Sequence, residues 1–405
     1  MRKRKTGFTP IKRSSQPCYR CYRMRIVVTA PNGVEGLLRR EMNRLGYTDG
    51  LTVGKGGVSF EGNAVDLARC NILIRQGERV LIELGRFTAL TFEELFQGTK
   101  SLPWEDWIGE QDAFPVAGRS VQSKLFSVSD CQSIVKKAIV ERLKTKYKKT
   151  TWFAETGVEY QIEFRISKDQ VTMLLDASGD GLHKRGWRKL NAQAPLKETI
   201  AAVMLTLSNW RPEQTLVDPF CGSGTILIEG ALKSLGVAPG INRSFAGEKW
   251  PQIPVQIWNE VREEARQAAA DRMKEKEEVL GGMRLEGYDI DPGVLSLARY
   301  HAKLAGVEQY IHFQQRDVRD FHSAKKYGAV ITNPAYGERM GDAAEAAKLY
   351  RTMGEVFAPL DTWSFYILTS HQGFEGAFGR RATKNTKLFN GRLECRLYQY
   401  HGPRR

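Results

Sequence analysis

Hydrophobic and polar positions change their period several times along the first part of the chain. Alternating apolar residues give way to apolar positions at helical spacing, and two short apolar runs then precede a second helical segment. This β-α-β-β-α order is typical of a small ferredoxin-like unit. The expected elements are a strand at 25–30, a helix at 34–45, strands at 51–53 and 58–60, and a helix at 65–73.

A basic α+β unit follows. The pattern predicts a strand at 121–127, a helix at 131–147 and a hairpin of strands at 160–166 and 170–176. One face of the helix is apolar, and the other carries the cationic side chains Lys136, Lys137, Arg142, Lys144 and Lys146. A charged face of this kind is most often simply solvated, and the alternative is contact with an RNA backbone.

From about residue 195 onwards, strands and helices alternate. This order predicts a parallel, doubly wound sheet with helices on both faces. The stretch at about 236–283 departs from it and is expected to be a helical insertion. The expected strands are 215–218, 284–289, 311–315, 328–332 and 364–368, and the expected helices are 196–207, 225–235, 293–305 and 344–357.

Composition narrows the class of protein. A chain of 405 residues with 41% hydrophobic residues is long enough for two or three packed domains. It lacks the run of about 20 apolar residues that a membrane helix needs, and its first residues do not form a secretory signal. Six cysteines without a disulfide framework suit a cytoplasmic location. The single CxxC pair, Cys18 and Cys21, has no second pair beside it, so no metal site is expected.

The net charge of +15 is unevenly distributed. The tail 1–23 contains eight basic residues and no acidic one, and the remainder of the chain is still basic. A polyanionic partner such as RNA is one explanation, through phosphate contacts and counterion release. A solubilising, disordered tail is the other.

The first of several predicted strand ends in the alternating region is rich in glycine. Gly222 and Gly224 allow a sharp turn and close approach of a ligand to the backbone, and the helix behind them favours a carboxylate at its N-terminus. A lone GxG is often only a tight turn, and neither a GxGxxG fingerprint nor a phosphate loop is present. The candidate cofactor residues here are Asp218, Pro219, Phe220, Cys221, Gly222 and Gly224.

Two further strand ends carry carboxylates. Asp289, after the second strand, can accept hydrogen bonds from both hydroxyls of a ribose, although it or Asp291 could instead cap the next helix. Asp317, followed by Val318, can accept from an adenine amino group or simply form a turn. Together the three ends outline S-adenosylmethionine. NAD is disfavoured because the third glycine is missing and the acid lies about 70 residues on, instead of the usual ~20.

The fourth strand runs into Asn333, Pro334, Ala335 and Tyr336. An exocyclic amine on a base is a poor nucleophile, because its lone pair is delocalised into the ring. The Asn333 side-chain oxygen and the Pro334 carbonyl can hold its two N–H groups, and Tyr336 can stack on the base. Alone, this motif could be an ordinary strand-ending turn. Its position behind a cofactor signature favours the catalytic interpretation.

These motifs resemble a known family, the THUMP-containing RNA guanine-N2 methyltransferases of the RlmL N-terminal and YpsC-like group. The resemblance covers essentially everything after about residue 23, and the residues that carry it are 182–188, 194–198, 218–225 and 333–339. It implies a Rossmann-like, doubly wound methyltransferase domain preceded by ferredoxin-like and THUMP domains. It also implies S-adenosylmethionine as cofactor and transfer to the 2-amino group of a guanosine in large-subunit (23S) ribosomal RNA.

The resemblance implies particular domain bounds and shows two departures. The expected parts are a basic tail at 1–23, a ferredoxin-like domain at 24–65, a THUMP domain at 66–177 and the methyltransferase domain at 178–405. Members of this group usually have a second proline where this chain has Ala335, and the tail is outside their pattern. Since the acceptor carbonyl belongs to Pro334, the chemistry is expected to survive.

Other functions remain open at this point. The Asn-Pro-x-Tyr motif recognises an amine and not a particular base, so methylation of guanine N2 in tRNA and of adenine N6 in DNA are alternatives. A non-catalytic RNA-binding assembly factor with the same fold is another. The THUMP-like region favours RNA over DNA.

Overall fold

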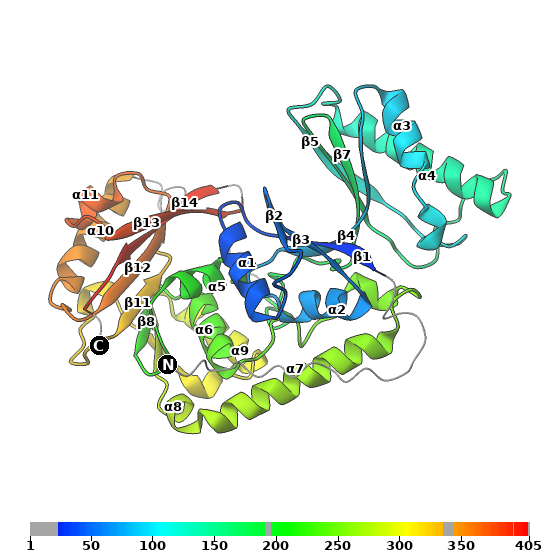
Figure 1. The fold of residues 1–405 in the computed structure, drawn as a ribbon. Coiled ribbons are helices and arrows are strands. Elements are labelled where there is room, and N and C mark those ends of the chain that lie inside the picture. Colours follow the sequence, from blue (N-terminus) through cyan, green and yellow to red (C-terminus); the bar gives the residue numbers. More distant parts are fainter. Residues whose placement is uncertain (1–22, 191–195, 335–342, 392, 404–405) are drawn as a thin grey trace.

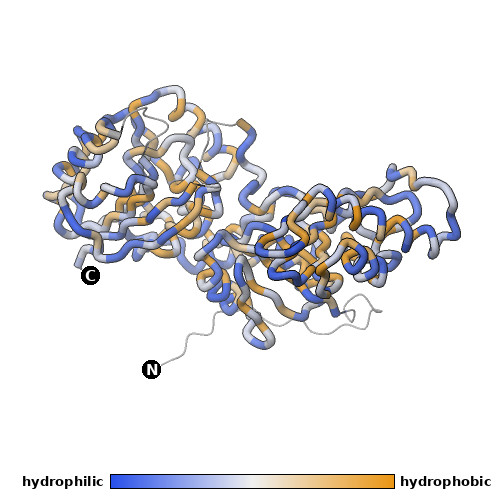
Figure 2. The backbone as a smooth tube through the Cα atoms, turned by 90° about the horizontal axis from the view of Figure 1, so that it is seen from above, coloured by the Kyte–Doolittle hydropathy of each residue, from blue (hydrophilic) through white to orange (hydrophobic). Residues whose placement is uncertain are grey.

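The strands form two sheets, one in each half of an elongated molecule (Figure 1). This computed structural model describes residues 23–190, 196–334, 343–391 and 393–403, and each of the two sheets has seven strands. Hydrophobic segments run through the interior of both lobes, while hydrophilic segments predominate at the outer turns (Figure 2). Each half therefore has its own apolar interior.

The first sheet joins the ferredoxin-like and THUMP-like units through one long strand. Its strand order is β2-β3-β1-β4-β7-β6-β5, and the ten-residue β4 pairs with β1 on one side and with β7 on the other. The expected boundary between residues 65 and 66 falls inside helix α2. The elements are β1 Met24–Thr29, α1 Glu35–Arg44, β2 Thr52–Gly54, β3 Gly57–Gly62, α2 Ala64–Leu73, β4 Arg79–Thr88, α3 Phe92–Lys100, η1 Trp104–Asp106, β5 Val116–Val121, α4 Val128–Tyr147, β6 Ile162–Ser167 and β7 Gln170–Asp176.

The strand expected at 121–127 is wrong, because β5 ends where that strand was predicted to begin. Gln122 has a φ of +51°, which stops extended pairing. The Ser120 hydroxyl then donates to the Leu125 carbonyl, which closes a turn, and Phe126 is 81% exposed. The apolar residues of this stretch therefore belong to a turn that leads into α4.

The second sheet has the order β10-β9-β8-β11-β12-β14-β13. The first five strands are parallel, as expected, and β14, which lies beyond the strands that the sequence predicted, is antiparallel to both of its neighbours. The physical reason is the short link from β13 to β14, which suffices for an antiparallel hairpin but not for a parallel crossover. The elements are α5 Glu198–Leu207, β8 Leu216–Asp218, α6 Thr225–Leu235, β9 Leu285–Asp289, α9 Pro292–Leu304, η3 Glu308–Tyr310, β10 Ile311–Gln315, η4 Val318–Asp320, β11 Ala329–Thr332, α10 Ala343–Phe357, β12 Ser364–Thr369, α11 Phe374–Phe378, β13 Lys384–Asn390 and β14 Leu393–Tyr400.

The order of the parallel strands creates a switch point between β8 and β11. From β8 the chain adds β9 and β10 on one side, and then crosses to add β11 and β12 on the other. At such a point the connections leave in opposite directions, and a crevice opens beyond the carboxyl ends of the two strands. The first and fourth strand ends singled out in the sequence therefore lie side by side.

The stretch expected as a helical insertion braces the two halves. It contains η2 Ala246–Lys249, α7 Val255–Glu275 and α8 Glu277–Gly281, and α7 runs beneath α2 (Figure 1). Trp250 stacks on Tyr160 of the first half, with 5.0 Å between ring centroids, and its indole N–H donates to the Glu159 carbonyl. These contacts hold the two sheets at a defined orientation.

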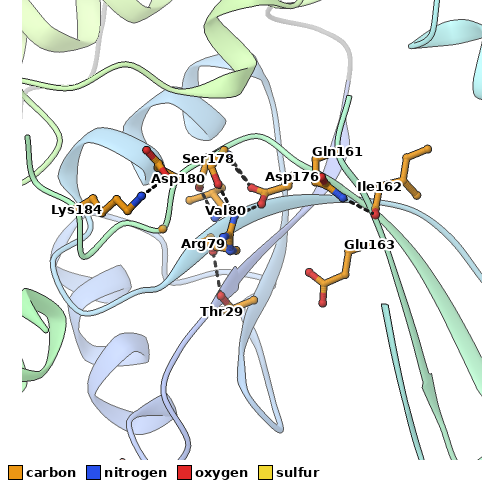
Figure 3. Close-up of polar contacts among 12 residues, drawn as sticks. Thr29, Arg79, Val80, Gln161, Ile162, Glu163, Asp176, Ser178, Asp180 and Lys184 are labelled. Atoms are coloured by element: carbon orange, nitrogen blue, oxygen red, sulfur yellow. Dashed lines mark hydrogen bonds and ion pairs between the residues drawn. The ribbon is translucent and has the colours of Figure 1, made fainter. Parts of the chain in front are cut away.

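The chain leaves the first sheet through a polar junction (Figure 3). Arg79 at the start of β4 pairs with Asp176 at the end of β7, and the same carboxylate accepts from the Ser178 and Gly179 amides. The Ser178 hydroxyl in turn accepts from the Val80 amide at 2.8 Å. The segment that leads to the second half is thus tied to the sheet at its first residues.

A buried charge cluster lies between the halves. Glu229 of α6 is fully buried, and its two carboxylate oxygens each lie 3.1 Å from a guanidinium, one of Arg75 and one of Arg185. Arg75 follows α2, and Arg185 belongs to the connecting segment. The Arg185 guanidinium also donates to the Arg75 carbonyl at 2.6 Å. One carboxylate therefore joins three parts of the molecule.

None of the helices in the described ranges has the length and apolar composition that a bilayer crossing requires.

Candidate active site

Asp218 and Thr332 join the two strand ends at the switch point. The Thr332 hydroxyl, at the end of β11, donates to the Asp218 carboxylate at the end of β8 over 2.7 Å, and the Phe220 amide donates to the same oxygen over 3.2 Å. Asp218 is 2% exposed, and this burial raises its pKa to about 7, against the lowering effect of those two hydrogen bonds. Asp218, which the sequence predicted as a cofactor residue, therefore also links the end of β8 to the end of β11.

The glycine turn after β8 is held against the end of β9. The Cys221 amide donates to the Tyr288 carbonyl at 2.9 Å, and the Gly222 amide donates to the Asp289 carboxylate at 3.0 Å. Gly222 has a φ of +51° and open space where a Cβ would lie, whereas a Cβ on Gly224 would come within 3.0 Å of the Phe313 ring. Gly222 therefore leaves room for a ligand, and Gly224 is required for packing.

The end of β9 separates two acids with different tasks. Asp291 caps α9 by accepting from the amides of Gly293 and Val294. Asp289 is partly buried, and its carboxylate lies beside the glycine turn, where it accepts from the Gly222 amide. Between them Ile290 is 65% exposed, an apolar surface that the sequence analysis did not single out.

The third strand end carries an ion pair. Asp317 caps η4 by accepting from the Arg319 amide at 2.8 Å, and its carboxylate also pairs with the Arg319 guanidinium at 2.6 Å. The hydrogen bonds from Arg319 lower the pKa of Asp317. Val318, the other residue predicted here, is buried at 5% exposure. An adenine amino group here would share Asp317 with Arg319.

Asn333 presents an acceptor without a partner. Its side-chain oxygen is buried, and among the residues that the structure describes it receives no hydrogen bond. Burying an acceptor atom costs free energy unless a ligand or a water molecule donates a hydrogen bond to it. Pro334 follows and is buried, while Ala335 and Tyr336 lie outside the described residues. The structure thus brings Asn333 to the crevice that Asp218 and Gly222 border.

Arg188 is a site residue that the sequence analysis missed. All three nitrogens of its guanidinium are used, on the Glu198 carboxylate at 2.7 Å, the Ser223 hydroxyl at 3.0 Å and the Thr225 hydroxyl at 2.7 Å. Ser223 and Thr225 flank Gly224 in the glycine turn. In the sequence, Arg188 belongs to the segment 182–188, which carries part of the family resemblance and could have indicated this residue. Arg188 thus holds the glycine turn from outside the second sheet.

Replacing Arg188 with glutamine should weaken cofactor binding about tenfold, the equivalent of losing one charge-assisted hydrogen bond. The glycine turn would lose two of its supports, and the buried Glu198 would lose its cation. Calorimetric titration with S-adenosylhomocysteine measures the change. Arg262→Gln is the matched control, because it breaks the half-buried Arg262–Glu248 pair of the insertion. Equal losses in the two variants would contradict a specific role of Arg188.

The chain matches three family models in sequence. They are the RMKL-like methyltransferase domain (UPF0020) at residues 185–399, the THUMP domain at residues 89–176 and the RlmL ferredoxin-like domain at residues 25–81. The order of these domains agrees with the order expected from the sequence.

Relatives and solved structures share nearly the whole chain. A protein of Bacillus subtilis (strain 168) named "Putative RNA methyltransferase YpsC" is 45% identical over 376 residues, which cover 93% of this chain and 95% of that protein. The ribosomal RNA large subunit methyltransferase K/L of Syntrophotalea carbinolica is 32% identical over 388 residues, which cover 93% of this chain and 53% of that protein. The chain therefore spans about half the length of the K/L relatives.

Two crystal structures superpose closely. One, described as a "predicted N6-adenine-specific DNA methylase" of Listeria monocytogenes, has a TM-score of 0.86 and 44% identity, and the match covers 94% of this chain and 97% of that one. The other is described as "SMU.472, a putative methyltransferase complexed with SAH", and it has a TM-score of 0.86 and 40% identity, with a match that covers 95% of this chain and 99% of that one. The family models, the full-length relative and these structures agree, and the chain belongs to the RMKL-like methyltransferase family with RlmL ferredoxin-like and THUMP domains.

Proposed function

We propose that this protein is an S-adenosylmethionine-dependent RNA methyltransferase that modifies the N2 amine of a guanosine in large-subunit ribosomal RNA. The observation that carries the proposal is the buried Asn333 oxygen at the switch point of the second sheet, which receives no hydrogen bond from the residues that the structure describes. The Asn333 oxygen and the Pro334 carbonyl can each accept a hydrogen bond from one of the two N–H groups of a planar amine. Neither the Asn333 side chain nor the Pro334 carbonyl needs to form a covalent bond with the substrate.

The residues present fit S-adenosylmethionine. The N-terminus of α6 and the open backbone at Gly222 suit a methionine carboxylate, and Asp289 beside them suits a ribose. The exposed Ile290 offers an apolar surface for a flat base, and Asp317 offers an acceptor for its amino group. When bound, this cofactor supplies an electrophilic methyl group on a sulfonium.

The chain's own contribution is orientation and electrostatics. Asn333 and Pro334 accept from the target amine, which favours a localised lone pair and aims it at the cofactor site. The Thr332–Asp218 hydrogen bond holds this acceptor pair in register with the glycine turn. Because the amine nitrogen attacks the methyl group directly and the methylated nitrogen then releases one proton to solvent, the contribution of the described residues is to hold both reactants in line.

RNA as the substrate class is supported by the THUMP match and by the names of the relatives. The Bacillus protein is named an RNA methyltransferase, and the K/L proteins are named for the large ribosomal subunit. Guanine N2 remains our proposal from the amine-holding motif and the family resemblance.

Adenine N6 in DNA is the second candidate. The Listeria structure carries that description, and an acceptor pair for an amine does not distinguish the two bases by itself. Methylation of guanine N2 in tRNA is equally compatible with the site. The basic first half of the molecule, with its THUMP domain, favours RNA over duplex DNA.

Tritiated methyl transfer to unmethylated ribosomal RNA, tRNA and duplex DNA tests the proposal. The products are digested to nucleosides and identified by mass spectrometry. We expect N2-methylguanosine from ribosomal RNA, and its position follows from mass mapping of ribosomal RNA from a strain that lacks the protein. N6-methyldeoxyadenosine from DNA, or methylated tRNA alone, would replace the proposal by the corresponding alternative. No transfer to any of the three would favour a binding factor.

A further inference from the structure

One end of α4 combines an exposed aromatic ring with positive charge. Trp152 follows the C-terminus of this helix and is 84% exposed, the largest exposed fraction among the large hydrophobic residues of the described chain. It lies in the THUMP match, and the helix α4 that precedes it lies on the side of the molecule away from the second sheet (Figure 1). An indole left in water is unusual, because a tryptophan side chain gains much free energy from burial.

The segment around Trp152 is anchored, so the exposure is not that of a loose end. The neighbouring Phe153 packs edge-on against Tyr147 and Phe114, with ring centroids 6.4 and 6.2 Å apart. The Tyr147 hydroxyl donates to the Ile108 carbonyl at 2.7 Å. Lys149 pairs with Glu110 at 2.9 Å. The chain on both sides of Trp152 is therefore held, and the indole is presented to solvent.

Basic residues are concentrated in the sequence next to Trp152. From Arg142 to Ala154 the chain contains five basic residues and no acidic one. The Lys144 ammonium lies 5.7 Å from the Trp152 ring centroid. Lys146 and Lys148 are exposed, and no ion pair within 4.0 Å involves either of them in the described ranges. By contrast, Lys136 and Arg142 of the same helix are engaged by Glu155 and Glu105.

We infer that Trp152, Lys146 and Lys148 form a docking platform for an unpaired nucleotide of the RNA substrate. The ring offers a flat apolar face on which a base can stack, and the two free ammonium groups offer contacts to the flanking phosphates. A protein partner would need a larger apolar patch than one indole among lysines. The inference rests on RNA as the substrate class, and it assigns to this helix end the positioning of RNA far from the methyl-transfer site.

The test measures RNA binding by fluorescence anisotropy without cofactor. The probe is a labelled single-stranded RNA of 12 nucleotides, compared with a duplex of the same length. Trp152→Ala should raise the Kd for the single strand roughly tenfold, while Trp152→Phe, which keeps an aromatic ring, should restore most of the affinity. The duplex should lose little, because its bases are already stacked.

Two further variants separate stacking from charge. Lys146→Gln/Lys148→Gln should lower the slope of log affinity against log salt by about 1.4, the value for two phosphate contacts on a single strand. Phe126→Ala is the matched control, because Phe126 is 81% exposed but lies before the other end of α4. We expect wild-type affinity from it.

Unchanged single-strand affinity of Trp152→Ala would overturn the inference, as would equal losses in Trp152→Ala and Phe126→Ala. Equal weakening of single strand and duplex would also overturn it, since it would indicate charge or shape instead of stacking. Because no methyl transfer is measured, failure of guanine N2 as the target would leave these results intact. The binding measurements therefore test the platform, and the methyl-transfer experiment separately tests the proposed reaction.

Discussion

Replacing Asn333 with alanine should lower the rate of methyl transfer by about 10² to 10³, the cost of removing one preorganised polar contact at a reacting centre. The amine would keep the Pro334 carbonyl but lose the acceptor that orients its second N–H. Because Asn333 stands outside the glycine turn, the affinity for S-adenosylhomocysteine should stay within about twofold of the wild type. Single-turnover transfer from labelled cofactor, together with calorimetry, measures both quantities.

The control for this variant is another asparagine of the same sheet. Asn385 in β13 accepts a hydrogen bond from Arg396 on the exposed edge, away from the crevice. Asn385→Ala should transfer methyl groups at the wild-type rate. A parallel loss of cofactor affinity in Asn333→Ala would indicate that Asn333 organises the cofactor site instead of the amine. An unaltered rate would remove Asn333 from the mechanism.

Replacing Glu229 with glutamine should have the largest effect on stability. Glutamine keeps the volume of the side chain but removes the one carboxylate that contacts the guanidiniums of both Arg75 and Arg185, so that Glu41 is the remaining acid that interacts with them. Breaking a buried ion pair on one side costs about 3–5 kcal/mol, because the remaining charge stays desolvated. Burial already lowers the pKa of Arg75, so its charge depends on the partner that Glu229 provides. Urea denaturation followed by circular dichroism measures the loss.

An exposed ion pair supplies the comparison. Lys387 and Glu394 pair across the β13–β14 hairpin with side chains about half exposed, so Glu394→Gln should cost at most about 1 kcal/mol. Limited proteolysis adds a second measurement, because Glu229→Gln should expose the connecting segment around Arg185 first. Equal stability losses in the two variants would contradict the view that the buried cluster joins the halves.

Much of the second half could be predicted from local patterns. The glycine turn at Gly222 and Gly224, the acid at Asp289 and the Asn-Pro pair at 333 and 334 each follow a predicted strand. Parallel strands bring their carboxyl ends to one edge, so their convergence follows from the order of elements. The role of Asp291 as helix cap was also foreseeable, because Asp before Pro-Gly is a helix-start signal.

Other features depended on contacts between distant positions. The apolar residues at 121–127 suggested a strand, but the positive φ at Gln122 turns the chain away. Ile290 and Trp152 are apolar, so the hydrophobic pattern of the sequence predicts that they are buried. Both are exposed, because exposure depends on which residues of the folded chain pack beside them. The antiparallel edge of the second sheet was not predicted, because β13 and β14 come after the region in which strands and helices alternate.

The sequence by itself determined the order of domains, the periodicity of the elements and the succession of chemical groups at the strand ends, because neighbouring residues carry that information. Only the tertiary structure decided which of these groups meet. Arg188 reaches Ser223 and Thr225, Arg75 reaches Glu229 across 154 positions, and Thr332 reaches Asp218 across 114. Such pairs have no local signature, since they form only when tertiary packing has brought residues that are distant in the sequence together and excluded water from between them.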